Sequence, residues 1–413
     1  MRIVKGQYPN IKIYFLLFVI YYVMDVIFPY NEGDMVDASV RIYPQIAMGL
    51  IFAYSLYYFI INFQQLNKIW LFRPFILLLI IMAFYIPFSP ERDLYQNFIQ
   101  FMKMNTASIS LFGFYLSIKK TDDYKLFYNL YIVMLLYGLF ALIRDYYVVK
   151  IVATRFVSND LFDSHSGFML ASLIPMTLML PAKKMRAVIY IILVVATMLS
   201  GQRAASIGAI ISLPFALKYI KGSMNKGNYM FLFIIGVTTI IVLLPAIETA
   251  IENIMLRQQH DADRGSIGSG RGEFYMIIIK SFFDSSLFNL LFGYGYFSIN
   301  ALLKVKFGLG ISAHNGFLEH LYTFGFLGFF VYLFIFINIY RFYRRLKSKN
   351  KNESNLVLMM LFVFLIRSVA AHGNLDITYI PFFMPIAILL SKSGRTEMKV
   401  IKRDMVLFVK NRS

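Results

Sequence analysis

The chain has 413 residues, of which 59% are hydrophobic, 17% aromatic and only 15% charged, and its formal net charge is +19. This composition excludes an ordinary soluble domain and is typical of a membrane protein with many crossings. The absence of cysteine excludes a disulfide framework and a thiolate metal site.

Apolar windows recur along the whole chain at lengths near the roughly 20 residues that a helix needs to cross a membrane. They predict an all-α, polytopic helical membrane protein, residues 1–413 forming one domain, with about twelve transmembrane helices. The first window follows a basic start and has no small-residue cleavage site after it, which favours an uncleaved span over a signal peptide. The expected spans are 11–28, 42–63, 69–88, 98–118, 126–149, 167–180, 187–199, 204–220, 229–247, 317–340, 356–371 and 377–390.

The basic residues follow the topology that these spans predict. With the N-terminus in the cytoplasm, most of the Lys and Arg residues fall in cytoplasmic connections, as the positive-inside rule requires. Both termini are then cytoplasmic. The positive charge is therefore explained by topology, and no nucleic-acid partner is expected. The segments concerned are "KKTDDYK", "PAKKMR", "KYIKGSMNKGN", "RFYRRLKSKNKN" and "KSGRTEMKVIKRD".

One connection is long, and this topology places it outside the cytoplasm. It covers residues 248–316, between the ninth and tenth spans, and long connections in compact proteins are usually functional. Within it, "SGRGEFYMIIIKSFFDSSLFNLLFGYGYF" mixes apolar and polar residues at near-helical spacing. We expect an amphipathic helix lying at the membrane surface there.

Arg203 lies at the outer end of a span rich in small residues, "LSGQRAASIGAIISL". Small residues let helices pack closely, which is their ordinary role in a membrane. An arginine among them requires a counter-charge, either a partner carboxylate or an anionic ligand. Arg271 follows a stretch of Gly and Ser in "RGSIGSGRGEFY", where backbone N–H groups and a guanidinium would suit phosphate oxygens. Glycine-rich connections are common, so the second signal is weak alone.

A third candidate opens the tenth span, in "SAHNGFLEHLYTFGFLGFF". His314 and Asn315 precede the helix, where N–H groups and the positive dipole end would face an anion. The alternative is a His-Asn helix cap at the interface. Glu319 lies one turn further in, and His320 is expected to be a packing residue.

Other charges also fall within the expected spans. Asp25 is one of them, and Arg144 with Asp145 is interpreted as a structural or rim pair. Arg367 lies about a turn from His372 and Asp376, which together would complete a polar cavity. No H-E-x-x-H pair, Walker loop or G-x-S-x-G elbow appears in the sequence, which argues against a metalloprotease, an ATPase or a serine hydrolase.

Taken together, these stretches resemble the O-antigen polymerase and O-antigen ligase superfamily, in its Wzy-type polymerase branch. The resemblance rests on three segments between about residues 195 and 335, in matching order and spacing: "LSGQRAASIGAIISL", "SGRGEFYMIIIKSFF" leading to "LLFGYGYF", and "AHNGFLEHLYTFGFLGFF". The segment "SGQR" departs from the shorter S-R or G-S-R arrangement that the family often has.

The resemblance implies a membrane glycosyltransferase with a GT-C-like fold that needs neither metal nor cofactor. It implies a bacterial inner-membrane location, a site facing the periplasm or exterior, and partners that are undecaprenyl-pyrophosphate-linked glycan donors and acceptors, membrane lipid and a chain-length co-polymerase. A polymerase would join the lipid-linked repeat units into O-antigen or a related surface polysaccharide.

The residue types suit this chemistry. Arginines would stabilise the charge that develops on a departing pyrophosphate, which assigns that role to Arg203 and Arg271. A neutral histidine would accept the proton of the acceptor hydroxyl, which assigns the general base to His314, with Asn315, Glu319 and Arg367 in support.

Two other functions remain open at this point. An O-antigen ligase, which transfers glycan to a lipid A core, has the same donor and leaving group, so the residues above do not separate it from a polymerase. A lipid-linked sugar flippase would have a similar number of spans. It would place polar groups near the midplane, often on broken helices, whereas the candidates here gather at one face around one loop.

Overall fold

The computed structural model describes residues 8–27, 42–120, 124–153, 166–200, 202–221, 255, 271–308, 312–370 and 375–393. The side chains of residues 145–153, 183, 184, 203, 220, 221 and 271 lie outside this description. Within the described ranges the chain is helical and contains no strand. The ordered elements are α1 (Ile11–Ile27), α2 (Ile42–Ile61), α3 (Phe63–Asn67), α4 (Arg73–Phe84), α5 (Leu94–Lys120), α6 (Lys125–Ala153), α7 (Ser166–Leu178), α8 (Lys183–Leu199), α9 (Arg203–Lys221), α11 (Arg271–Phe283), α12 (Leu287–Phe292), α13 (Ser298–Phe307), α14 (Gly316–Lys347), α15 (Lys351–Ala370) and the 3₁₀ turn η1 (Ile377–Tyr379), which opens a last helix, Ile377–Ser393.

Most helices coincide with the expected spans to within a few residues. The exceptions are the ninth span, 229–247, which lies outside the described residues, and the tenth, 317–340, where α14 is interrupted at Gly325 and continues to Lys347. Among the described helices, four are long and apolar enough to cross a membrane: α2, residues 125–144 of α6, α14 and α15. Five more are apolar but shorter. The chain is therefore an integral membrane protein, while twelve crossings and the side on which each connection lies remain predictions.

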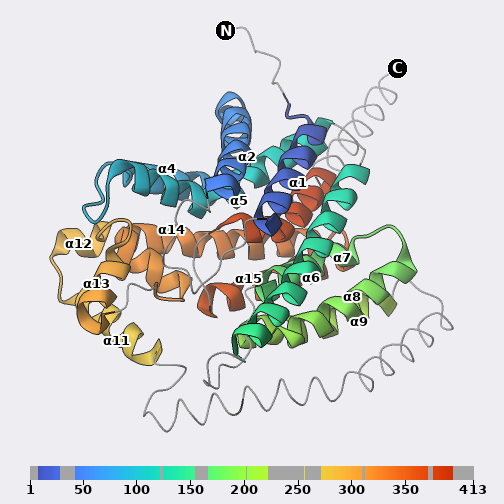
Figure 1. Ribbon diagram of the computed structural model, residues 1–413. Helices are drawn as coiled ribbons and strands as arrows, with labels where there is room; N and C mark the ends of the chain where they lie inside the picture. Colours follow the sequence, from blue (N-terminus) through green and yellow to red (C-terminus); the bar gives the residue numbers. More distant parts are fainter. Residues whose placement is uncertain are drawn as a thin grey trace, which may run out of the picture.

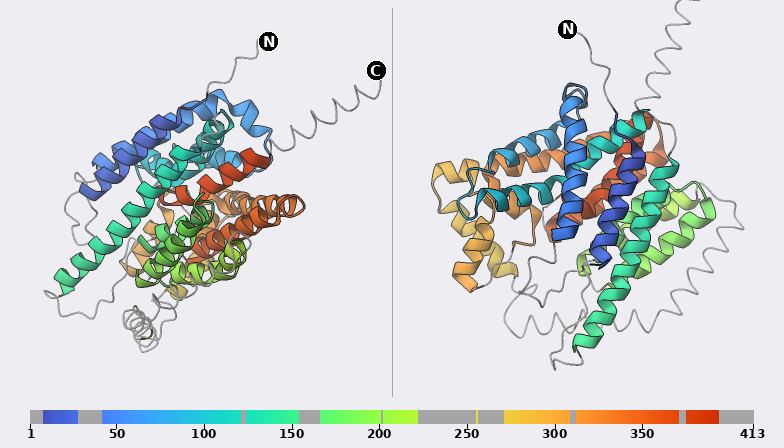
Figure 2. Two further views of the ribbon diagram at one scale, coloured as in Figure 1. Left: turned by 90° about the vertical axis from the view of Figure 1, so that its right-hand side faces the viewer. Right: turned by 45° about the horizontal axis from the view of Figure 1, so that its top comes forward.

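Figure 1 shows α14 and α15 passing through the middle of the molecule. The blue helices α1 and α2 and the neighbouring α4 and α5 lie on one side of them, and the green helices α7, α8 and α9 on the other. The described part of the long connection forms α11, α12 and α13, which gather at one end of α14. The views in Figure 2 show α1 and α6 side by side at the periphery.

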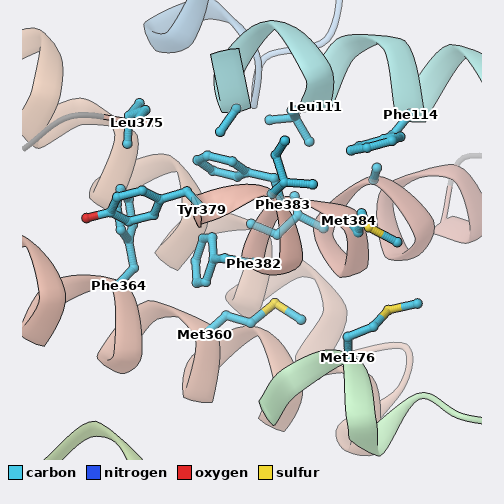
Figure 3. Packing of buried hydrophobic residues seen from close by; sticks show 14 of the residues in the cluster. Leu111, Phe114, Met176, Met360, Phe364, Leu375, Tyr379, Phe382, Phe383 and Met384 are labelled. Carbon is cyan, nitrogen blue, oxygen red and sulfur yellow. The ribbon is translucent and has the colours of Figure 1, made fainter. Parts of the chain in front are cut away.

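The last helix, Ile377–Ser393, forms the centre of the core. Its apolar side chains between Ile377 and Leu389 are all at most 4% exposed. A helix that is apolar around its whole circumference is stable only when other helices surround it, and here α4, α5, α7 and α15 supply the neighbours. Figure 3 shows this packing, with Leu111 and Phe114 from α5, Met176 from α7, and Met360 and Phe364 from α15 around Phe382, Phe383 and Met384.

Candidate functional site

The helix that contains Glu319, and that begins directly after His314 and Asn315, is broken. Inside α14, Gly325 has φ 64° and ψ −166°, a conformation that no α-helix contains. The first segment, residues 316–324, folds back along the second, residues 326–347. Phe317 consequently packs its ring on Phe336 at a centroid distance of 5.4 Å and on Tyr332 at 5.5 Å. The expectation of one uninterrupted span from Phe317 to Tyr340 is therefore wrong. An unbroken helix would hold Phe317 and Phe336 roughly 28 Å apart.

A backbone pairing holds the break in place. Where α14 stops at Gly325, the carbonyls of Tyr322 and Thr323 lose the amides that a continuing helix would supply. The segment 293–296, "GYGY", supplies two instead: the N–H of Tyr294 donates to Tyr322 O at 3.0 Å, and that of Gly295 donates to Thr323 O at 2.9 Å. We call this segment the G-Y-G latch. Its glycines are needed because Gly293 and Gly295 have φ of 76° and 87°, and because any side chain at Gly293 would overlap the backbone of Gly325.

The latch is itself fixed to α4 and the turn that follows it. The Tyr296 hydroxyl donates to Met82 O at 2.7 Å, and the Tyr296 N–H donates to Ser89 Oγ at 2.8 Å. Tyr85 donates its hydroxyl to Phe292 O and packs its ring against Phe324. The end of the first segment of α14 is therefore held between the long connection and the α4–α5 turn.

His314 and Asn315 lie at the other end of that segment. His314 is half-buried and has φ 50°, a left-handed conformation that is uncommon for a residue with a side chain and tends to occur at functional positions. Its carbonyl accepts a hydrogen bond from the Tyr275 hydroxyl at 3.4 Å. Asn315 is the N-cap of α14, since its Oδ1 accepts from the N–H groups of Phe317 at 3.0 Å and Leu318 at 3.1 Å. The helix-cap alternative is thus confirmed for Asn315, whereas His314 is not the capping residue.

Glu319 and His320 follow within one turn. Glu319 is only 7% exposed and lies within electrostatic range of the Tyr332 and Tyr379 hydroxyls. His320 is confirmed as a packing residue. It is 1% exposed, stacks on Tyr332 with ring centroids 4.0 Å apart, and places Nδ1 2.8 Å from Gly316 O.

Arg367, near the outer end of α15 in the predicted topology, joins three elements. Its NH1 donates to Ser172 Oγ at 3.0 Å and to Thr378 O at 3.1 Å, and its NH2 donates to Thr378 Oγ1. NH2 also lies 3.7 Å from Asp376 Oδ1, and the guanidinium stacks on the Tyr379 ring at 3.6 Å. The predicted association of Arg367 with Asp376 is confirmed, while His372 lies outside the described residues. With its charge already paired and stacked, Arg367 acts mainly as a tie between α7, α15 and η1.

Arg271 is the first residue of α11, and its helix runs parallel to the first segment of α14. Tyr275 contacts His314, and six residues later the Ser281 hydroxyl lies 3.4 Å from that of Tyr322. The backbone of Arg271 therefore lies at the same end of the pair as His314 and Asn315. Its side chain lies outside the described part of the chain.

Arg203 opens α9, next to the first turn of α7. A Cβ added at Gly167 would meet Gln202 Cβ at 3.0 Å and the Ser200 side chain closer still, which shows how tightly these turns pack. In the next position of α7, the Phe168 ring lies 5.7 Å from the Arg367 guanidinium. The start of α9 and Arg367 thus flank one turn of α7, and the Arg203 side chain itself lies outside the description.

The fold brings these elements into one region by two short chains of contacts. One runs from α9 through α7 to Arg367 and Tyr379, and the other from α11 through the start of α14 to Glu319, which lies within electrostatic range of Tyr379. The sequence alone did not identify Ser172, Thr378 or Tyr379 as site residues. The run "DITY" after Arg367 is the one feature that could have pointed to Thr378 and Tyr379. Within the described residues, no three His, Cys, Asp or Glu side chains gather as a metal site would require.

Comparison with known proteins adds one finding. Residues 188–333 match the family model described as O-antigen ligase. No curated protein matches the chain significantly. The matched region contains α9, α11, α12, α13, the latch and the first segment of α14, so it includes Arg203, Arg271 and His314. Over this region the chain is therefore similar to the O-antigen ligase family.

Proposed function

We propose that the chain is a membrane glycosyltransferase that polymerises oligosaccharide repeat units carried on undecaprenyl pyrophosphate, at the outer face of the bacterial inner membrane. The observation that carries the proposal is the family match over residues 188–333. The grouping of the starts of α9, α11 and α14 supports it, because Arg203 opens α9, Arg271 opens α11, and His314 and Asn315 directly precede α14.

In the proposed reaction, an acceptor hydroxyl oxygen forms a bond to the anomeric carbon of the donor glycan. The bond from that carbon to pyrophosphate breaks, and the electron pair leaves with undecaprenyl pyrophosphate. Arg203 and Arg271 stabilise the charge that develops on the leaving oxygens. His314 accepts the hydroxyl proton, Asn315 fixes the start of the helix beside it, and Glu319 supports the acceptor side. Arg367 positions these elements and does not bind pyrophosphate directly.

Transporters also use broken helices, so the break in α14 does not distinguish a transferase from a transporter. The family match does favour a transferase, because the described family carries out glycan transfer and not transport. Polymerase and ligase remain alternatives with the same donor. We propose the polymerase because one is needed for each glycan type and such enzymes are diverse and rich in Phe and Tyr.

The histidines provide a matched pair for testing the site. Asparagine adopts the left-handed conformation of His314 readily, so His314→Asn keeps the backbone and removes the imidazole, the proposed base. His320→Phe keeps a ring on Tyr332 and loses the contact with Gly316 O, at a cost of about 1 kcal/mol of stability. We expect His314→Asn to lower glycan extension by at least about a hundredfold, and His320→Phe to retain it.

The measurement is the glycan ladder of a strain lacking its own gene and carrying each variant, at matched protein levels in the membrane. Single-repeat product on the core would indicate loss of a polymerase, whereas an unsubstituted core would indicate loss of a ligase. Normal ladders from His314→Asn together with failure of His320→Phe would exchange the roles of the two histidines and refute the assignment.

A further inference from the structure

A second polar cluster lies between α1, α6 and η1, beside the Arg367 network. The Tyr137 hydroxyl of α6 donates to Asp25 Oδ2 of α1. The Tyr22 ring packs on Tyr137 with centroids 4.6 Å apart, and on Tyr21 at 5.3 Å. Asp376, the partner of Arg367, lies within electrostatic range of the Tyr21 and Tyr22 hydroxyls. The cluster is therefore continuous with the candidate site.

The Tyr22 hydroxyl has no protein partner within the described part of the chain. Tyr22 is only 4% exposed, and its oxygen makes no hydrogen bond. Other buried tyrosine hydroxyls are satisfied: Tyr14 donates to Ser55, and those of Tyr131 and Tyr332 bond Thr177 and Ser368. Leaving a buried hydroxyl without a partner costs free energy, so a native protein that keeps one there usually uses it.

A structural role accounts for only part of the cluster. The bond from Tyr137 to Asp25 ties α1 to α6, and that tie explains both residues. It does not explain why the Tyr22 oxygen is buried within electrostatic range of two carboxylates and bonded to neither. A phenylalanine would fill the same space at lower cost.

The groups around Tyr22 suit a neutral, hydroxyl-rich ligand. Asp25 and Asp376 accept hydrogen bonds, the phenol of Tyr22 can donate one, and Arg144 lies within electrostatic range of Tyr137. The tyrosine rings offer apolar surfaces to the faces of sugar rings. Because Asp25 and Asp376 would repel a pyrophosphate, the fitting ligand is a saccharide without phosphate.

We propose that Tyr22, Asp25 and Asp376 form a subsite for the acceptor saccharide, with the Tyr22 hydroxyl donating to one of its oxygens. The proposal rests on the proposed function and deepens it, since it divides the site into a pyrophosphate side near Arg203 and Arg271 and a sugar side at the end of α1. It assigns a binding role to the N-terminal part of the chain, which lies outside the family match.

Tyr22→Phe is the direct test, because it removes an oxygen that makes no hydrogen bond to the described residues. We expect the purified full-length variant in detergent to melt at the wild-type temperature or above it. Its affinity for the phosphate-free oligosaccharide repeat unit, prepared from the strain's own polysaccharide and measured by saturation-transfer NMR, should fall about tenfold. Its affinity for inorganic pyrophosphate should not change.

Tyr131→Phe is the matched control, because it removes a satisfied hydroxyl from α6. It should lower the melting temperature and leave both affinities unchanged. Oligosaccharide binding by Tyr22→Phe within about twofold of wild type would overturn the subsite and leave the proposed function standing. Wild-type protein that binds neither the oligosaccharide nor pyrophosphate would overturn both proposals.

Discussion

At the scale of single residues, the charged groups of the candidate site divide into those engaged with neighbouring residues and those placed at helix starts. Arg367 belongs to the first kind, because Ser172, Thr378, Asp376 and the Tyr379 ring all contact its guanidinium. The planar, five-donor geometry of arginine makes this arrangement feasible, and a lysine has neither the fork nor the stacking surface. A guanidinium engaged in this way sets the positions of its neighbours.

This role predicts a stability effect for Arg367→Lys. The ammonium would reach one partner and leave the others in a buried site, at a cost of about 3 kcal/mol in the free energy of unfolding. Thermal melting in detergent measures the loss, and Arg344→Lys, a change at an exposed position on α14, serves as the control. Equal melting temperatures for the two variants would show that the ties of Arg367 contribute little.

The sequence predicts some of these residues and not others, for a physical reason. Arg367 and Asp376 are both charged within or beside an apolar span, and the cost of burying each alone is enough to predict that they meet. Tyr379 is one aromatic residue among many, and its stacking on Arg367 depends on the 3₁₀ turn that follows Asp376. Composition and spacing carry no information about such a turn. Nor do they show that the Tyr22 hydroxyl has no hydrogen-bond partner among the described residues.

At the scale of elements, the break in α14 is the main departure from expectation. The segment "FLEHLYTFGFLGFF" stays apolar through Gly325, and glycine is common inside membrane helices, so a hydropathy window predicts one span. Gly325 differs only in its backbone conformation, which the latch imposes from a distant segment. The helical segments were predictable because apolar periodicity is local. The reversal was not, because it depends on contacts with residues 293–296.

The break can be tested by thiol crosslinking, because the chain has no cysteine of its own. Cysteines at Phe317 and Phe336 should be joined by a short bifunctional reagent, since their rings lie 5.4 Å apart. Adding Gly325→Ala should abolish the product and glycan extension together. An alanine there would face positive φ and overlap Leu291 O, which favours an unbroken helix.

A matched control places the second cysteine at Lys347, which is exposed and lies about 16 Å beyond Phe336 on the same helical segment. Crosslinking of positions 317 and 336 that survives Gly325→Ala would show that the glycine does not determine the reversal. Absence of crosslinking in the unmodified background would contradict the reversal itself.

At the scale of the whole molecule, the burial of the last helix and the charge at the end of α14 fit the same arrangement of helices. The helix Ile377–Ser393 is enclosed by its neighbours, which explains how an apolar segment near the end of the sequence can organise the core. The basic end of the second segment of α14, with Arg344, Arg345 and Lys347 in its last turn, is the end expected in the cytoplasm. The latch and α11–α13 lie at the opposite end of that segment.

Single cysteines again give a direct measurement, this time of topology. Asp284→Cys, in the turn after α11, should react with a membrane-impermeant maleimide in cells whose outer membrane has been permeabilised. Lys349→Cys, after the basic end of α14, should react only after the inner membrane is opened. Both positions are exposed in the fold, so a difference in labelling reports sidedness. Labelling of Lys349→Cys alone in unopened cells would invert the proposed topology.

The G-Y-G latch also determines which insertions in the sequence the fold can accept. The first segment of α14 is fastened at Gly325 by residues 293–296 and stacked along its length on Tyr332 and Phe336. Its other end, with His314 and Asn315, is thus positioned by contacts with the core and with Tyr275 more than by the chain that leads to it. Insertions between α9 and α11 would leave the histidine where it is. If the proposed function holds, the connection between α9 and α11 can change to fit a new glycan while the proposed reacting groups keep their spacing.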